Sequence, residues 1–304
     1  MAPILTATGE CRYRILLARI SSVGMKNQYS VIVRADDQPI EGEGKIMLKE
    51  YRITDEGEII LHDKVEAAIS MIQEYCPPEG YYVAFSGGKD SIVILDLVKR
   101  VGVKYDAHYN ITTVDPPELV RFIKTFPEVE RDRPAETMWQ LIKRKQFLPL
   151  RQQRWCCEVL KESRGEGRFI ITGIRRAESV KRSKRRVVEQ CFKGTAKIFI
   201  NLIINWTDKD VWDYIHLNRL RYCSLYDEGF KRLGCVCCPM GDQKRDAARW
   251  PKIAAAYKRA AIEAHNAAIA AGKKRSFNSG EEMYEWWISG KGNTDRPDQG
   301  VMFE

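Results

Sequence analysis

The spacing of apolar and polar residues changes along the chain, and the change divides it into three parts. Residues 13–20, 29–35 and 56–62 are short apolar runs separated by Gly, Asn and Asp, a pattern typical of β-strands joined by turns. Residues 63–75 have helical spacing and end before two prolines, which cannot continue a helix. We therefore expect a small β-rich N-terminal piece over residues 1–62.

From Tyr81 onward the pattern alternates between strand and helix. Strands are predicted from Tyr81 and over residues 103–112, 168–174 and 197–204, and helices over residues 116–126, 136–145 and 208–218. This alternation is typical of a mostly parallel sheet with helices on both faces. We expect a doubly wound α/β domain over residues 63–242. A C-terminal extension over residues 243–304 follows, helical from Gln243 to Ala271 and then a polar tail.

Composition narrows the class of protein. The chain has 304 residues and a net charge of +9, and no apolar run approaches the roughly 18 residues that span a bilayer. Its first residues do not have the pattern of a secretory leader, so we expect a cytoplasmic protein without membrane contact. The positive charge favours a polyanionic partner, either nucleic acid or a phosphorylated small molecule, but it also suits a basic enzyme without one. We also expect a homo-oligomer, of a size that the sequence does not fix.

The segment Ser86–Ser91 has the composition of a phosphate-binding turn. Gly87 and Gly88 permit positive φ and let a ligand approach the backbone, and the start of the following helix favours an anion. Lys89 adds a positive charge, the two serines add hydroxyl donors, and Asp90 can cap the helix or bind a metal ion such as Mg²⁺. The spacing is not that of a Walker motif. The alternative is a glycine-rich turn with a polar cap.

The nine cysteines are an odd count and suggest metal or redox chemistry rather than a disulfide framework. Cys156 and Cys157 are adjacent, and Cys235 and Cys238 form a C-x-x-C pair. Four thiolates from two distant segments suit either zinc or a [4Fe–4S] cluster. An adjacent pair is unlike the usual zinc knuckle, which favours the cluster. Free thiols are the third alternative.

A basic segment follows the predicted strand at residues 168–174. Ligands of doubly wound sheets bind beyond the carboxyl ends of the strands, so Arg175 and Arg176 should face the same crevice as Ser86–Ser91. Guanidinium groups suit a phosphate or sulfate. The cations that follow suit substrate or nucleic acid, or form a solvated surface; they are Lys181, Arg182, Lys184, Arg185 and Arg186.

Together these segments resemble a known family. Ser86–Ser91, "SGGKDS", is similar to the PP-loop of the adenine nucleotide α-hydrolase superfamily, which includes ATP pyrophosphatases and the phosphoadenosine phosphosulfate (PAPS) reductase family. Residues 172–182, "TGIRRAESVKR", and residues 201–215, "NLIINWTDKDVWDYI", resemble the PAPS reductase family, as do the cysteine segments 155–157 and 234–240.

The resemblance implies an adenine nucleotide α-hydrolase-like fold and an enzyme of sulfur metabolism. It implies that Ser86, Gly87, Gly88, Lys89, Asp90 and Ser91 bind ATP, PAPS or adenosine phosphosulfate (APS). It places Lys89, Asp90, Arg175 and Arg176 in catalysis, and both arginines with Lys181 and Arg182 in substrate binding. It also implies a [4Fe–4S] cluster on Cys156, Cys157, Cys235 and Cys238, with zinc as the alternative.

Two departures from the reductase pattern decide which reaction we expect. APS and PAPS reductases end in a tail with a nucleophilic cysteine, whereas the last cysteine here is Cys238. They also often have a degenerate PP-loop, whereas this one is complete, as in ATP-using relatives. The sequence thus favours ATP-dependent, adenylating sulfur transfer from a persulfide donor to an acceptor such as nucleic acid.

Two other functions stay open. One is reduction of PAPS or APS to sulfite with a thioredoxin-like donor, in which Cys223 or Cys237 replaces the missing thiol. The other is a non-catalytic, nucleotide-sensing iron–sulfur module of a DNA-modification complex.

Overall fold

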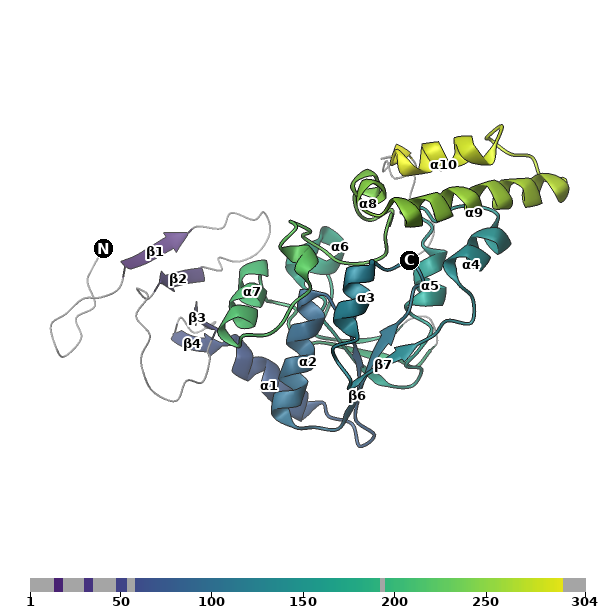
Figure 1. Cartoon of the computed structure of the whole chain (residues 1–304). Helices are drawn as coiled ribbons and strands as arrows, with labels where there is room; N and C mark the ends of the chain where they lie inside the picture. The colour runs from purple at the N-terminus through teal and green to yellow at the C-terminus, as the bar shows by residue number, and fades with distance from the viewer. Residues whose placement is uncertain (1–13, 19–29, 35–47, 54–57, 192–194, 292–304) are drawn as a thin grey trace, which may run out of the picture.

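A mostly parallel six-stranded sheet forms the centre of the protein, which confirms the predicted α/β class (Figure 1). The computed structural model describes residues 14–18, 30–34, 48–53, 58–191 and 195–291. The strand order is β7-β6-β5-β8-β10-β9, and only the edge strand β9 is antiparallel to its neighbour. The strands are β5 (Tyr81–Ala84), β6 (Tyr105–Asn110), β7 (Val129–Asp132), β8 (Phe169–Thr172), β9 (Val188–Gln190) and β10 (Ile198–Asn201).

A separate antiparallel sheet precedes this core. Its strands are β1 (Arg14–Ala18), β2 (Ser30–Arg34), β3 (Lys49–Ile53) and β4 (Ile59–Asp63), paired in chain order. The three predicted N-terminal strands correspond to β1, β2 and β4. Strand β3 was not predicted, because its sequence, KEYRI, has no apolar run. The domain boundaries given above remain predictions.

One face of the central sheet is covered by α1 (Lys64–Glu74), α2 (Lys89–Val101) and α7 (Asp208–Leu217), which lie side by side in Figure 1. Asp63 caps α1 by accepting hydrogen bonds from the backbone amides of Val65 and Glu66. The Tyr81 hydroxyl then donates to the carbonyl of Ile72, which fixes α1 to β5. Buried apolar side chains therefore meet between this helical layer and the sheet.

The opposite face of the sheet carries α5 (Trp155–Leu160) and the loop that leads to β8. Gly165 in this loop lies against Tyr82 and Ile170, whose side chains point away from α1 and α2. A Cβ at Gly165 would lie 2.9 Å from Ile170 Cδ1, so the loop packs closely on the sheet. The remaining helices near the sheet are α3 (Pro117–Ile123), α4 (Met138–Lys145) and α6 (Val180–Ser183).

The C-terminal extension forms α8 (Gln243–Arg249), α9 (Pro251–Ala270) and α10 (Gly280–Ile288). The single helical region expected from Gln243 to Ala271 is divided at Pro251, which begins α9 because a proline is favoured in a first helical turn. The expectation of a polar tail after Ala271 was wrong for residues 280–288, since α10 buries three large side chains between its acidic residues: Met283, Tyr284 and Trp287.

None of the helices among the described residues combines the length and the apolar character needed to cross a membrane.

We predict that Gly280→Ala weakens the packing of α10 on α9. A Cβ at this position would lie 2.3 Å from Ile262 Cα, and backbone atoms cannot move aside cheaply. Overpacking of this kind costs about 1–3 kcal/mol. Urea denaturation should show that loss, whereas the exposed Glu281→Ala in the same turn should change the free energy of unfolding by less than about 0.5 kcal/mol. Equal stabilities of the two variants would contradict the close contact.

Candidate functional site: a nucleotide-sized cleft beside a group of cysteines

The turn between β5 and α2 has the backbone of a phosphate-binding loop. Gly87 has a φ of 71°, and a Cβ there would lie 2.7 Å from Ile123 Cγ1, so both conformation and packing require glycine. Gly88 has a φ of −78°, so only Gly87 of the two uses the positive φ that glycine permits. A Cβ at Gly88 would clear its neighbours by at least 3.4 Å, which leaves room for a ligand to approach the backbone.

Hydrogen bonds hold the turn in place before any ligand arrives. The Ser91 hydroxyl donates to the carbonyl of Gly88 at 2.8 Å, and the Ser86 hydroxyl lies 3.3 Å from that of Ser91. The amide of Lys89 donates to the Tyr226 hydroxyl at 2.8 Å. The N-cap residue Gly88 has no side chain to cap α2, so an anion can bind beside the Lys89 amide and benefit from the helix dipole.

A network of four charged side chains lies under the turn. Arg175 is 3% exposed, and its Nε donates to Asp90 Oδ1 at 2.6 Å while its Nη2 donates to Asp208 Oδ1 at 3.0 Å. Lys89 Nζ lies 3.1 Å from Asp208 and 3.5 Å from Asp90. Burial alone would raise the pKa of Asp208, but Lys89 and Arg175 outweigh it and hold that pKa below its usual value. Both cations are therefore oriented by carboxylates at the base of the turn.

These residues line a cleft of about 950 Å³ at the carboxyl end of the sheet. The turn forms part of the lining, which also includes the aromatic side chains of Trp212, Tyr226 and Phe230. The predicted residues that line it are Ser86, Gly88, Lys89, Asp90, Ser91, Arg175 and Arg182. A cavity of this size, with one cationic end and aromatic side chains, has the dimensions and chemistry for a nucleotide.

Three predicted residues are not among those that line this cleft: Gly87 of the turn, Arg176 and Lys181. Arg176 turns away from it, because its guanidinium donates to the carbonyl of Arg185 and to Asn205. Lys181 is exposed on α6 and is not part of the cleft wall. Arg182, by contrast, lines the cleft and pairs with Glu178. The roles predicted for Arg176 and Lys181 remain predictions.

The four predicted metal-ligating cysteines are near one another. Cys156 and Cys157 lie in the first turn of α5, and Cys235 and Cys238 lie in the loop before α8. The sulfurs are close enough for Cys235 and Cys238 to raise the pKa of Cys156. From α9, the buried Tyr257 also lies close, since after burial itself these thiols raise its pKa. The C-terminal helices therefore cover this group.

The surroundings of Cys157 favour its thiolate form. The Cys156 thiol donates to the sulfur of Cys157, and this hydrogen bond together with the charges of Lys161 and Arg154 lowers the pKa of Cys157. Burial has the opposite effect on Cys235 and raises its pKa to about 11. Removing that proton is unfavourable unless a metal pays the cost, as metal centres do when they bind thiolates.

The donor set and its spacing test which metal group fits. Four sulfurs are soft ligands and suit zinc or an iron–sulfur cluster. Zinc–sulfur bonds of about 2.3 Å place tetrahedral sulfurs roughly 3.8 Å apart. Within the described part of the chain, no three cysteine sulfurs lie within 4.8 Å of one another. The four thiols are therefore suitable donors for either group, but they are not arranged here as the close tetrahedron of a zinc site.

The remaining thiols near the site are buried. Cys237 is 0% exposed, and burial with the charge of Asp246 raises its pKa to about 12. Cys223 is 1% exposed, and burial raises its pKa as well. A thiol must be an accessible thiolate to act as a nucleophile. Neither residue meets that condition in this structure.

Sequence reasoning missed three residues of the site. Asp208 and Tyr226 hold Lys89, and they come from segments far along the chain. Lys161 lines the cleft, and its pKa is raised first by Cys235 and further by Asp115, Cys157 and Cys238. The sequence did contain a signal for Lys161. It lies four residues after Cys157, and residues four apart share one face of a helix, so the two side chains are expected to be neighbours.

The fold and this site define an α/β protein with a PP-loop-like cleft beside a cysteine group. The family model of the phosphoadenosine phosphosulfate reductase domain matches residues 80–240, and the chain belongs to this family. That match spans β5 to Cys238 and includes both the turn and the four cysteines.

Individual relatives agree at the level of family. Two uncharacterized proteins of Methanocaldococcus jannaschii are 31% and 30% identical over 59% and 56% of this chain, which covers 46% and 39% of their lengths. The chain thus spans less than half of these relatives. An adenosine 5'-phosphosulfate reductase of Lysinibacillus sphaericus is 29% identical over 55% of this chain and 75% of its own length. Among solved structures, the PAPS reductase of Candida auris is 20% identical with a TM-score of 0.45, covering 57% of this chain and 87% of that chain.

We predict that Lys89→Ala and Gly88→Val each reduce the affinity for adenine nucleotide by at least about tenfold, or 1.4 kcal/mol. The first removes a charge from the phosphates, and the second fills the space over the backbone of the turn. Isothermal titration calorimetry measures both. Lys99→Ala, on the exposed side of the same helix, is the matched control and should stay within about twofold of the wild type. Unchanged affinity in both site variants would show that the nucleotide binds elsewhere.

Proposed function

We propose that this protein binds ATP in the cleft and uses it to activate an acceptor for sulfur transfer. An oxygen of the acceptor attacks the α-phosphorus, the bond to the bridging oxygen breaks, and pyrophosphate leaves. The terminal sulfur of a persulfide donor then attacks the activated carbon and displaces AMP. A thiol reductant cleaves the disulfide that remains on the acceptor.

The observation that carries this proposal is the position of Lys89 at the start of α2, where the N-cap residue Gly88 has no capping side chain. Backbone amides and a fixed ammonium group stabilise the charge that develops on a departing pyrophosphate. Asp208 and Asp90 orient the ammonium group, so little reorganisation is needed when the leaving group separates. Asp90 also offers an oxygen to a magnesium ion that accompanies the phosphates.

The burial of the thiols supports sulfur transfer over reduction. Reduction of PAPS or APS by this family proceeds through a cysteine that attacks the sulfur of the substrate. Cys223 and Cys237 are buried with raised pKa values, and Cys156, Cys157, Cys235 and Cys238 suit a metal group. Among the described residues, this leaves no exposed thiolate at the cleft. The nucleophilic sulfur would then come from a donor protein.

The mouth of the cleft suits a polyanionic acceptor. Arg182 lines the cleft, as do the exposed Lys231 and Arg232. Lys184 and Arg186 extend the positive surface beyond Arg182. Contacts of this kind with nucleic acid release counterions and weaken as salt is added.

APS reduction is the second candidate, and a specific observation favours it. The adenosine 5'-phosphosulfate reductases are similar over the region that includes the cleft and the cysteines. Lys161 borders both, and its charge would attract the sulfate of APS as readily as a phosphate. In this reading a thiol outside the described residues, or one supplied by another protein, takes the nucleophile's role.

The two reactions give different products. With ATP, a nucleic-acid acceptor and a persulfide donor, we predict pyrophosphate release that falls steeply as salt is raised, and no sulfite from PAPS or APS with thioredoxin. Phosphate-release and sulfite assays on one preparation measure both. Rapid thioredoxin-dependent sulfite release would overturn the proposal and establish reduction instead.

We also propose that Cys156, Cys157, Cys235 and Cys238 hold a [4Fe–4S] cluster. When bound, it supplies a buried, polarizable charge beside Lys161 and fixes α5 to the loop before α8. Lys161 and Arg154 offset the charge of its thiolates, and Tyr257 covers it.

We predict about four irons per chain and a brown colour after purification without oxygen, as expected for one such cluster. Cys157→Ser and Cys235→Ser should each abolish the visible absorbance, whereas Cys76→Ser, which lies outside the group, should keep it. Colourless wild-type protein with one zinc per chain would contradict the cluster and leave a structural zinc site.

A further inference from the structure

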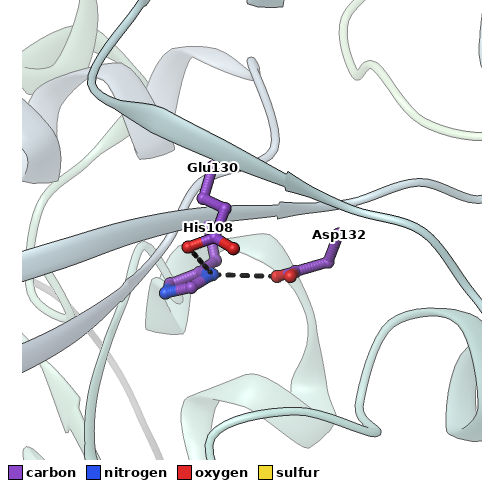
Figure 2. A group of neighbouring side chains, drawn as sticks. All are labelled: His108, Glu130 and Asp132. Carbon is purple, nitrogen blue, oxygen red and sulfur yellow. Dashed lines mark hydrogen bonds and ion pairs between the residues drawn. The ribbon is translucent and has the colours of Figure 1, made fainter.

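A histidine with two carboxylates lies on the face of the sheet opposite α1 and α2, outside the nucleotide cleft. His108 comes from β6, and Glu130 and Asp132 come from the neighbouring strand β7 (Figure 2). Asp106 is also a residue of β6. The ligand atoms of His108, Glu130 and Asp132 all lie within 4.8 Å of one another. None of the three lines the nucleotide cleft.

The two ring nitrogens of His108 have different surroundings. Nε2 lies 2.7 Å from Asp106 Oδ2, and Arg168 Nη2 holds the other oxygen of that carboxylate at 2.5 Å. Nδ1 lies 2.9 Å from Asp132 and 3.8 Å from Glu130. A carboxylate on one ring nitrogen is the arrangement that orients metal-binding histidines, because it fixes the proton there and frees the other nitrogen.

A second observation concerns Tyr82, whose side chain lies beside His108. The ring of Tyr82 stacks on His108, with 4.4 Å between centroids and 2° between the planes. Tyr82 is 5% exposed, and among the described residues Asn110 approaches its hydroxyl without reaching the distance and angle of a normal hydrogen bond. Burial and the nearby Asp132 carboxylate raise its pKa to about 12, although Asn110 lowers it in part. A buried hydroxyl without a partner is costly, and a ligand water on a bound ion would satisfy it.

We propose that His108, Asp132 and Glu130 bind a divalent first-row transition-metal ion. The site offers one imidazole nitrogen and carboxylate oxygens but no thiolate, and this donor set suits Mn²⁺, Fe²⁺ and Zn²⁺. The buried Asp132 and the half-buried His108 supply ligands from adjacent strands, and the 69% exposed Glu130 closes the site from outside. Water completes the coordination.

The ion would tie the four-residue strand β7 to β6 at the edge of the sheet. The same edge meets the segment after α5, because the Asn110 amide donates to the carbonyl of Lys161. The site is independent of the function proposed for the cleft. In the absence of an ion, a protonated His108 between Asp106 and Asp132 would satisfy the same carboxylates, and the experiment separates the two states.

Manganese is the appropriate probe, because it disfavours the thiolates of the cysteine group. Titration of the full, nucleotide-free chain with Mn²⁺, followed by electron paramagnetic resonance, should show one bound ion per chain with a nitrogen coupling from imidazole. His108→Gln should remove that coupling, and Asp132→Asn should weaken binding by at least about tenfold. Asp106→Asn, which acts through the orientation of His108, should cost about 10- to 100-fold.

Two further variants keep the test decisive if a buried substitution impairs folding. Glu130→Gln changes an exposed ligand and should weaken binding several-fold in a folded protein. Asp213→Asn removes a carboxylate on α7 that pairs only locally with Lys209, and should bind Mn²⁺ like the wild type. Binding that is equal in wild type, E130Q and H108Q would overturn the proposal. Binding without nitrogen coupling would do the same, and would leave His108 as a protonated member of an ion-pair network.

Discussion

The proposed nucleotide site depends on the ion pairs of Arg175 with Asp90 and Asp208. A cation that is 3% exposed must be paired, because an unpaired buried charge costs several kcal/mol. Its partners come from two helices: Asp90 from α2 and Asp208 from α7. Because Lys89 pairs with the same carboxylates, its ammonium group is placed by Arg175 as well. Arg175 is thus a positioning residue for Lys89, and its own charge is largely balanced within the protein.

The charge of Lys161 links the cleft electrostatically to the cysteines. Lys161 borders the cleft and lies close enough to Cys235, Cys157 and Cys238 for these cysteines to raise its pKa. A change in charge at the cysteine group therefore changes the field at the ligand. Helix α9 contributes to this arrangement, because the buried Tyr257 lies close to the sulfurs. The C-terminal extension therefore contributes a side chain to the surroundings of the cysteine group.

Local chemistry could be predicted from the sequence, whereas long-range pairing could not. Ser86–Ser91 is contiguous, and its glycines, lysine and serines indicate the turn directly. The pairing of Arg175 with Asp90 and Asp208 joins three separate segments, and only the fold brings them together. Strand β7 was missed because V-E-R-D has no apolar run, and with it the approach of Asp132 to His108. Helix α10 was missed because acidic residues alternate with the aromatic residues it buries.

The central claim is that the turn at Ser86–Ser91 holds the pyrophosphate of ATP. Calorimetric competition on the wild-type chain tests it most directly, with ATP, pyrophosphate, PAPS and APS as titrants. The account predicts that ATP binds most tightly and that pyrophosphate competes with it. Tight binding of PAPS or APS, with no competition from pyrophosphate, would contradict it.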